Sequence, residues 1–136
     1  MCLTLFITFF LSAAFPAYNR DFVIIANRSL AGVEISAGDL RNIYLGTRTT
    51  LEGQHVEPVL AQSGPAHHQF VAACLGKTET GLRNYFRSLV FAGKGGILKT
   101  FPSTGELVQY VARTKGAIGY VDDGAELAGV TRVTLK

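Results

Sequence analysis

Cysteine is scarce in this chain, and its two cysteines predict no disulfide. Cys2 precedes an apolar N-terminal stretch that we expect to be removed, which leaves Cys74 alone. A chain of 136 residues buries roughly two-thirds of its unfolded surface, so its core needs neither disulfides nor metals. A small disulfide scaffold and a disordered chain are excluded, and the length suits one domain. Apolar neighbours predict that Cys74 is a buried small hydrophobe rather than a reactive thiol.

Charge is absent from the N-terminal end. No Asp, Glu, Lys or Arg precedes Arg20, and 13 of the first 17 residues are hydrophobic. The apolar stretch is shorter than the roughly 20 residues of a membrane-spanning helix, and Pro16 follows it. We predict a signal peptide over residues 1–17, cleaved after Ala14 or Ala17, and a periplasmic domain over residues 18–136. Because basic residues are missing in front of the stretch, an upstream start and retention as an anchor stay open as alternatives.

Basic runs, nucleotide-binding loops and metal-ligand spacings are also absent. The formal net charge is +3, which favours an anionic partner weakly, and no basic run predicts a nucleic-acid partner. The glycine-rich segment 92–96 lacks the spacing of a Walker loop. His67 and His68 lie about 100° apart on a helix, with no carboxylate nearby at ligand spacing. We therefore predict no metal site and no cofactor.

Hydrophobic patterning predicts strands that alternate with helices. The run Phe22 to Ala26 is apolar throughout, as in a strand buried on both faces of a largely parallel sheet. Further strands are expected at residues 56–61, 117–121 and 130–135, with Pro58 indicating an edge position or a strand start. The alternation predicts an α/β fold with a mixed, mainly parallel sheet flanked by helices.

Four amphipathic helices are expected between these strands. Ser36 and Ser103 begin two of them, each with an acidic residue three positions later as in a capping box. A third follows the loop 62–65 and ends at Gly76, and a fourth runs from about Thr80 to Phe91 with an apolar stripe on one side.

The loop between the second strand and the second helix is the leading candidate for a ligand site. Backbone N–H groups and the dipole at a helix start attract oxyanions, and Pro65 stands where first-turn prolines are favoured. We predict an oxyanion site built from Gln62, Ser63, Gly64, Ala66 and His67. The alternative is that Ser63 only caps the helix.

Catalysis is not predicted. Ser63 and His67 form a nucleophile-base pair by residue type, but the orienting acid would have to be a distant one, Asp122 or Asp123. We therefore expect a protein that is not an enzyme.

Arg83 and Arg87 lie one helical turn apart and could form a basic face beside Lys94. The favoured interpretation is a solvated face opposite the apolar stripe of their helix.

Four segments, in this order, resemble the phosphate-binding periplasmic proteins of ABC transporters: Leu40–Gly46, Val59–Phe70, Leu82–Gly95 and Gly116–Val121. More closely, the chain resembles the short exported phosphate-transporter-substrate-binding-like proteins. The resemblance covers roughly residue 21 to the C-terminus. It implies a single lobe of the type 2 periplasmic binding fold.

The resemblance also implies a function. In full-length relatives the loop that matches residues 61–67 is of the type Arg-Ser-Asp-Gly-Ser-Gly-Thr and holds phosphate, and Gly64 is the match in the unshifted alignment. A protein that binds phosphate or a similar oxyanion, in connection with transport or sensing, is therefore implied. Its expected partners are a membrane transporter or sensor component and a second copy that closes the site. The alternative is a ligand-free accessory module for protein interaction.

Overall fold

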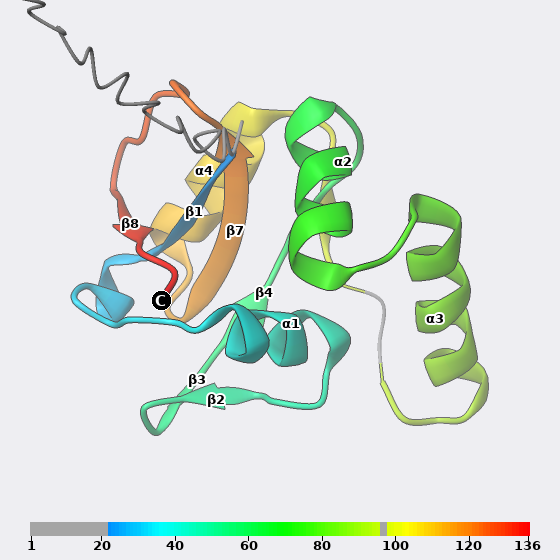
Figure 1. Cartoon of the computed structure of the whole chain (residues 1–136). Helices are drawn as coiled ribbons and strands as arrows, with labels where there is room; N and C mark the ends of the chain where they lie inside the picture. Colours follow the sequence, from blue (N-terminus) through cyan, green and yellow to red (C-terminus); the bar gives the residue numbers. More distant parts are fainter. Residues whose placement is uncertain (1–21, 96–97) are drawn as a thin grey trace, which may run out of the picture.

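The computed structural model describes residues 22–95 and 98–136, and the predicted signal peptide lies outside them. A four-stranded sheet with helices against it forms the body of the molecule (Figure 1). Its strand order is β4 (Glu57–Pro58), β7 (Ala117–Asp122), β1 (Phe22–Asn27) and β8 (Val130–Val133). The predicted α/β class with a mixed sheet flanked by helices is confirmed.

Strand direction differs from the expectation of mainly parallel pairing. β1 runs antiparallel to both β7 and β8, and the parallel pair in this sheet is the short one between β4 and β7. Helices cover both faces of β1, because Ile24 joins the core with α1 (Ala37–Leu45) while Ile25 joins the core with α4 (Thr104–Arg113). A strand that is buried on both faces is apolar throughout, whether its neighbours run parallel or antiparallel. The hydrophobic pattern therefore did not reveal the strand direction.

The four predicted helices are confirmed, and local capping explains their bounds. The Ser36 and Ser103 hydroxyls accept hydrogen bonds from the backbone N–H groups of Asp39 and Glu106 at 3.0 and 3.3 Å, which starts α1 and α4. Gly46 ends α1 in the left-handed conformation. The remaining two helices are α2 (Pro65–Phe70), which continues as a π turn over Val71–Leu75, and α3 (Glu79–Phe91).

The predicted strand 56–61 is one extended segment that pairs on both edges. The N–H groups of Glu57 and Val59 bond to Gly116, just before β7, and to Ile118 in β7, whereas those of Leu60 and Gln62 bond to the segment around β6 (Thr100–Phe101). The segment contains two short strands, β4 and β5 (Leu60–Ala61), and β5 pairs in parallel with β6. Pro58, without an N–H, occupies the outer edge of the four-stranded sheet. The pattern missed β6 and the hairpin of β2 (Thr50–Leu51) with β3 (Gln54–His55).

An aromatic cluster fastens α1 and α2 to the sheet. Tyr44 on α1 donates a hydrogen bond from its hydroxyl to the carbonyl oxygen of Val59 at 2.9 Å, and its ring lies 4.7 Å from that of Phe70. Phe70 in turn stacks on Tyr120 of β7 at 3.9 Å. Cys74 is half-buried and packs against this core. Among the described residues, no helix has the length and apolarity needed to span a bilayer.

Candidate functional site

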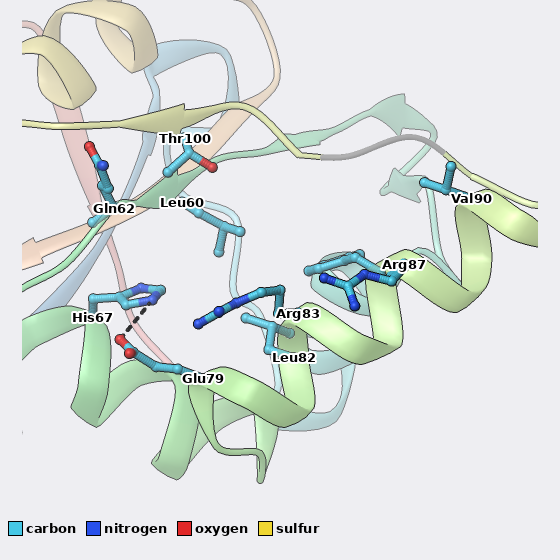
Figure 2. Close-up of a pocket in the computed structure, with 11 residues that line it drawn as sticks. Leu60, Gln62, His67, Glu79, Leu82, Arg83, Arg87, Val90 and Thr100 are labelled. Atoms are coloured by element: carbon cyan, nitrogen blue, oxygen red, sulfur yellow. Dashed lines mark ion pairs between the residues drawn. The ribbon is translucent and has the colours of Figure 1, made fainter.

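A pocket of about 390 Å³ lies between α3 and the ends of β5 and β6 (Figure 2). Figure 1 shows α3 to one side of the sheet, beyond α2. The side chains that line the pocket come from four elements and the turn after β5: Leu60, Ala61, Gln62, His67, Glu79, Leu82, Arg83, Phe86, Arg87, Val90 and Thr100.

Two arginines of α3 line this pocket. Leu82 and Phe86 are buried and fix the face of α3 that packs on the protein, so Arg83 and Arg87, each one residue later, project from the flank of that face. Figure 2 shows Arg83 reaching across the pocket toward His67. Both arginines are exposed, as expected of a solvated face, but they border the apolar stripe rather than oppose it. Lys94 is not among the lining residues.

His67 is the most buried polar group of the pocket, with 7% of its surface exposed. Its Nδ1 lies 2.5 Å from the Tyr120 hydroxyl, which also accepts a hydrogen bond from the backbone N–H of Ala61 at 3.0 Å. Its Nε2 lies 3.4 Å from Oε1 of Glu79, and His68 Nδ1 lies 3.3 Å from the same oxygen. A chain of contacts thus joins β5, β7, α2 and α3.

Burial determines the protonation states of His67 and Tyr120. It lowers the pKa of His67 from its ordinary value, although the nearby Glu79 carboxylate acts in the opposite direction. Burial also raises the pKa of the Tyr120 phenol, so both groups are neutral at pH 7. The Tyr120 hydroxyl then donates to Nδ1, and the imidazole proton is on Nε2, which faces Glu79.

The predicted site residues divide into two groups. Gln62 and His67 line the pocket. Ser63 and Gly64 lie in the turn before α2 and Ala66 lies in the first turn of α2; none of the three is among the lining residues. Gly64, at a φ of 110°, is the residue before α2, and no side chain in the described part of the chain caps this helix. The alternative in which Ser63 caps the helix is therefore wrong, because Gly64 holds that position.

Ser63 is not among the residues that line the pocket with His67. Both ring nitrogens of His67 face Tyr120 or Glu79, so the imidazole is not aligned with the Ser63 hydroxyl. Within residues 22–95 and 98–136, no group of three or more His, Cys, Asp and Glu side chains is arranged to hold a metal ion.

Sequence reasoning missed Glu79, Thr100 and Tyr120 as parts of the site. Tyr120 belongs to a motif that suggested fold rather than ligand contact, and Glu79 lies just before the helix expected over residues 80–91 and was not singled out. These residues are far from His67 in the sequence and follow no helix or strand periodicity relative to it. Only the folded structure brings them together. The spacing of Arg83 and Arg87 was the one available sign of a basic wall.

The chain is similar in fold to part of proteins that are described as phosphate receptors or substrate-binding proteins of ABC transporters. An ABC-type phosphate transport receptor from Vibrio cholerae superimposes with a TM-score of 0.62 and 14% identity, over 85% of this chain and 46% of the receptor. A protein from Clostridium perfringens, assigned as a phosphate ABC transporter substrate-binding protein and solved with bound phosphate, gives a TM-score of 0.64 at 14% identity, over 85% and 44%.

A third similar structure is assigned as a phosphate-binding protein of Planctomyces limnophilus. Its TM-score is 0.56 at 15% identity, over 85% of this chain and 41% of that protein. The chain has the fold of one lobe. It spans less than half the length of each of these proteins. No protein-family model matches the sequence, and no curated protein matches it.

Proposed function

We propose that the chain is an exported solute-binding-like protein, not an enzyme, that binds phosphate or a similar oxyanion in the pocket between α2 and α3. The observation that carries the proposal is the pair Arg83 and Arg87 in the pocket wall. Within the described residues, neither forms an ion pair with a carboxylate. Guanidinium groups present paired N–H donors that suit tetrahedral oxyanions.

The remaining polar groups fit this ligand class. His67 is neutral, its Nε2–H faces the Glu79 carboxylate, and the ring lies at the end of the pocket toward which Arg83 reaches (Figure 2). With two arginines and one carboxylate, Glu79, the pocket is net positive. The similar solved structures are named as phosphate receptors or phosphate-binding proteins, and phosphate is a tetrahedral oxyanion. The turn with Ser63 and Gly64 adjoins Gln62 and remains part of the proposed site.

The test is isothermal titration of the purified protein with inorganic phosphate and then sulfate at low ionic strength. We expect saturable binding that weakens with added salt. Arg83→Gln and Arg87→Gln should each weaken it about tenfold, since each removes a charge-assisted contact. Arg41→Gln is the matched control, because Arg41 is exposed on α1 and does not line the pocket. Unaltered binding in both pocket variants contradicts the proposal.

A second variant separates the two parts of the site. Ser63→Asp adds a negative charge at the turn before α2, where it repels an anion held by the backbone N–H groups. If the turn contacts the ligand, this variant weakens phosphate binding as strongly as Arg83→Gln does. If the arginines alone hold the anion, it weakens binding less than twofold.

The second candidate function is a ligand-free accessory module. It is favoured by the end of α3, where Phe91 is 86% exposed and the adjacent Val90 is 47% exposed. Its partner would be a transporter or sensor component, or a second copy of this chain. Light scattering after size-exclusion chromatography tests the second copy: a dimer that Phe91→Ser converts to a monomer, with no heat from any oxyanion, would favour this function.

Export is the remaining part of the proposal. Mass spectrometry of the protein recovered from the periplasmic fraction should give a chain that begins at Phe15 or at Tyr18, according to the cleavage site. A membrane-bound protein that retains Met1 contradicts cleavage and supports an anchor.

A further inference from the structure

We propose that the natural ligand of this pocket is an organic phosphate, in which a phosphate head carries an apolar group, rather than inorganic phosphate. This inference rests on the proposed oxyanion function and specifies its substrate class. Three features of the pocket support it: its volume, its length along α3 and the distribution of polar and apolar side chains.

The volume is too large for a bare oxyanion. The pocket measures about 390 Å³, whereas one water molecule takes about 30 Å³ of liquid. The pocket therefore has room for on the order of ten water molecules, and it falls in the range of roughly 300–1,000 Å³ that is typical of sites for organic ligands. An inorganic phosphate would leave most of it filled with water.

The pocket is also elongated. Its lining residues on α3 run from Glu79 to Val90, a distance of roughly 16 Å at about 1.5 Å per helical residue. A tetrahedral oxyanion reaches the side chains around one point of such a wall. A ligand that contacts the whole wall needs a second, longer part.

Polar and apolar groups are separated along this length. In Figure 2, His67, Glu79 and Gln62 gather at one end with the tip of Arg83, and Val90 lies at the other end. Leu60, Leu82 and Phe86 form apolar wall between α3 and β5 and are each more than nine-tenths buried in the fold. The parts of these side chains that face the pocket offer nothing to an inorganic ion, and a hydrocarbon group would cover that remaining apolar surface.

The two arginines occupy the junction between these regions. Side chains four residues apart on a helix have Cβ atoms about 6 Å apart, so Arg83 and Arg87 can both reach one phosphate head. Arg87 lies one turn before Val90. A head held by both guanidinium groups therefore places its organic substituent along the wall toward Val90, which is 47% exposed and free to be covered.

The test compares inorganic phosphate with methyl, butyl and hexyl phosphate by titration calorimetry on the purified protein. If the apolar wall takes the organic group, the dissociation constant falls with chain length by up to about fourfold for each methylene that becomes buried. Hexanol, which has the tail without the head, should bind at least a hundredfold more weakly than hexyl phosphate. Arg83→Gln should weaken all four phosphates by a similar factor.

Val90→Ser and Phe91→Ser form a matched pair for the tail. Both remove an exposed apolar side chain near the end of α3, but Val90 lines the pocket and Phe91 does not. We expect Val90→Ser to weaken hexyl phosphate about two- to fourfold and to leave inorganic phosphate unchanged. Phe91→Ser should alter neither ligand.

The outcomes separate this inference from the proposed function. Equal affinity for inorganic and hexyl phosphate, with loss in Arg83→Gln, overturns the inference and supports oxyanion binding. Absence of binding by every phosphate overturns both. Hexanol that binds as tightly as hexyl phosphate, with no effect of Arg83→Gln, shows an apolar site that does not recognise an anion, and it also overturns both.

Discussion

The Tyr120 hydroxyl and the Nδ1 atom of His67 are hydrogen-bonded at 2.5 Å, although 53 residues separate them in the chain. The same hydroxyl accepts a hydrogen bond from the backbone N–H of Ala61. A strand in the middle of the sheet thereby fixes both the start of the ligand-site turn and the orientation of the pocket histidine. The stability of the sheet and the geometry of the pocket are coupled through this one phenol.

Removal of the Tyr120 hydroxyl should therefore be costly. Tyr120→Phe keeps the ring on Phe70 but leaves the Ala61 N–H and His67 Nδ1 without their partner. We expect the free energy of unfolding to fall by about 1–3 kcal/mol, as measured by urea denaturation followed by circular dichroism. Tyr85→Phe is the comparison, because among the described residues the Tyr85 hydroxyl has one hydrogen-bond partner, the carbonyl oxygen of Leu45. Equal stability of Tyr120→Phe and the wild type would show that the hydroxyl contributes nothing.

Stability should depend on pH through His67. Burial lowers the pKa of this imidazole in the folded protein, so below the ordinary value of about 6.5 the unfolded chain binds more protons than the folded one. The free energy of unfolding therefore falls as the pH drops below about 6.5 toward the lower folded pKa. The charged groups that act on the ring are Glu79 and His68, the Tyr120 hydroxyl lies beside its Nδ1, and Arg83 reaches toward it in Figure 2.

The measurement is chemical denaturation at several pH values between 5 and 8 for the wild type and for His67→Gln. The variant should lose the part of the pH dependence that belongs to His67 while it keeps the rest. Parallel curves for the two proteins would assign the pH dependence to other groups.

Two glycines of the motif near the C-terminus should not tolerate alanine. Gly116 has a φ of +79°, and a Cβ there would run into the carbonyl oxygen of His55. At Gly119 a Cβ would lie 2.8 Å from Cδ2 of Leu107 and 3.2 Å from Cγ2 of Val59. We expect Gly119→Ala to lower the free energy of unfolding by about 1–3 kcal/mol through overpacking, and Gly116→Ala to lower it further through backbone strain.

Gly105→Ala provides the control for these substitutions. Gly105 lies in the first turn of α4, with nothing within 4 Å of its added Cβ. Alanine there should leave stability unchanged or raise it by up to about 1 kcal/mol. Thermal denaturation that ranks the three variants in a different order would refute this explanation of the motif.

Local interactions made much of the fold predictable from the sequence. Ser36, Ser103 and Gly46 mark helix ends because caps form between residues close together in the chain. The apolar run of β1 and the stripe of α3 identified their elements and the core. In the site, Gln62 and His67 were predicted as ligand residues because both adjoin a strand-to-helix turn.

Tertiary structure alone decided the strand directions and the composition of the pocket. The burial of β1 on both faces is the same beside parallel and antiparallel neighbours, so its pattern could not tell them apart. Arg83 would be equally exposed on a solvated face and in a pocket wall; its role depends on where α3 packs. The sequence by itself determined the four helices, the longer strands and their buried faces, because these follow from residues close together in the chain, whereas the meeting of His67, Tyr120 and Glu79 required long-range packing.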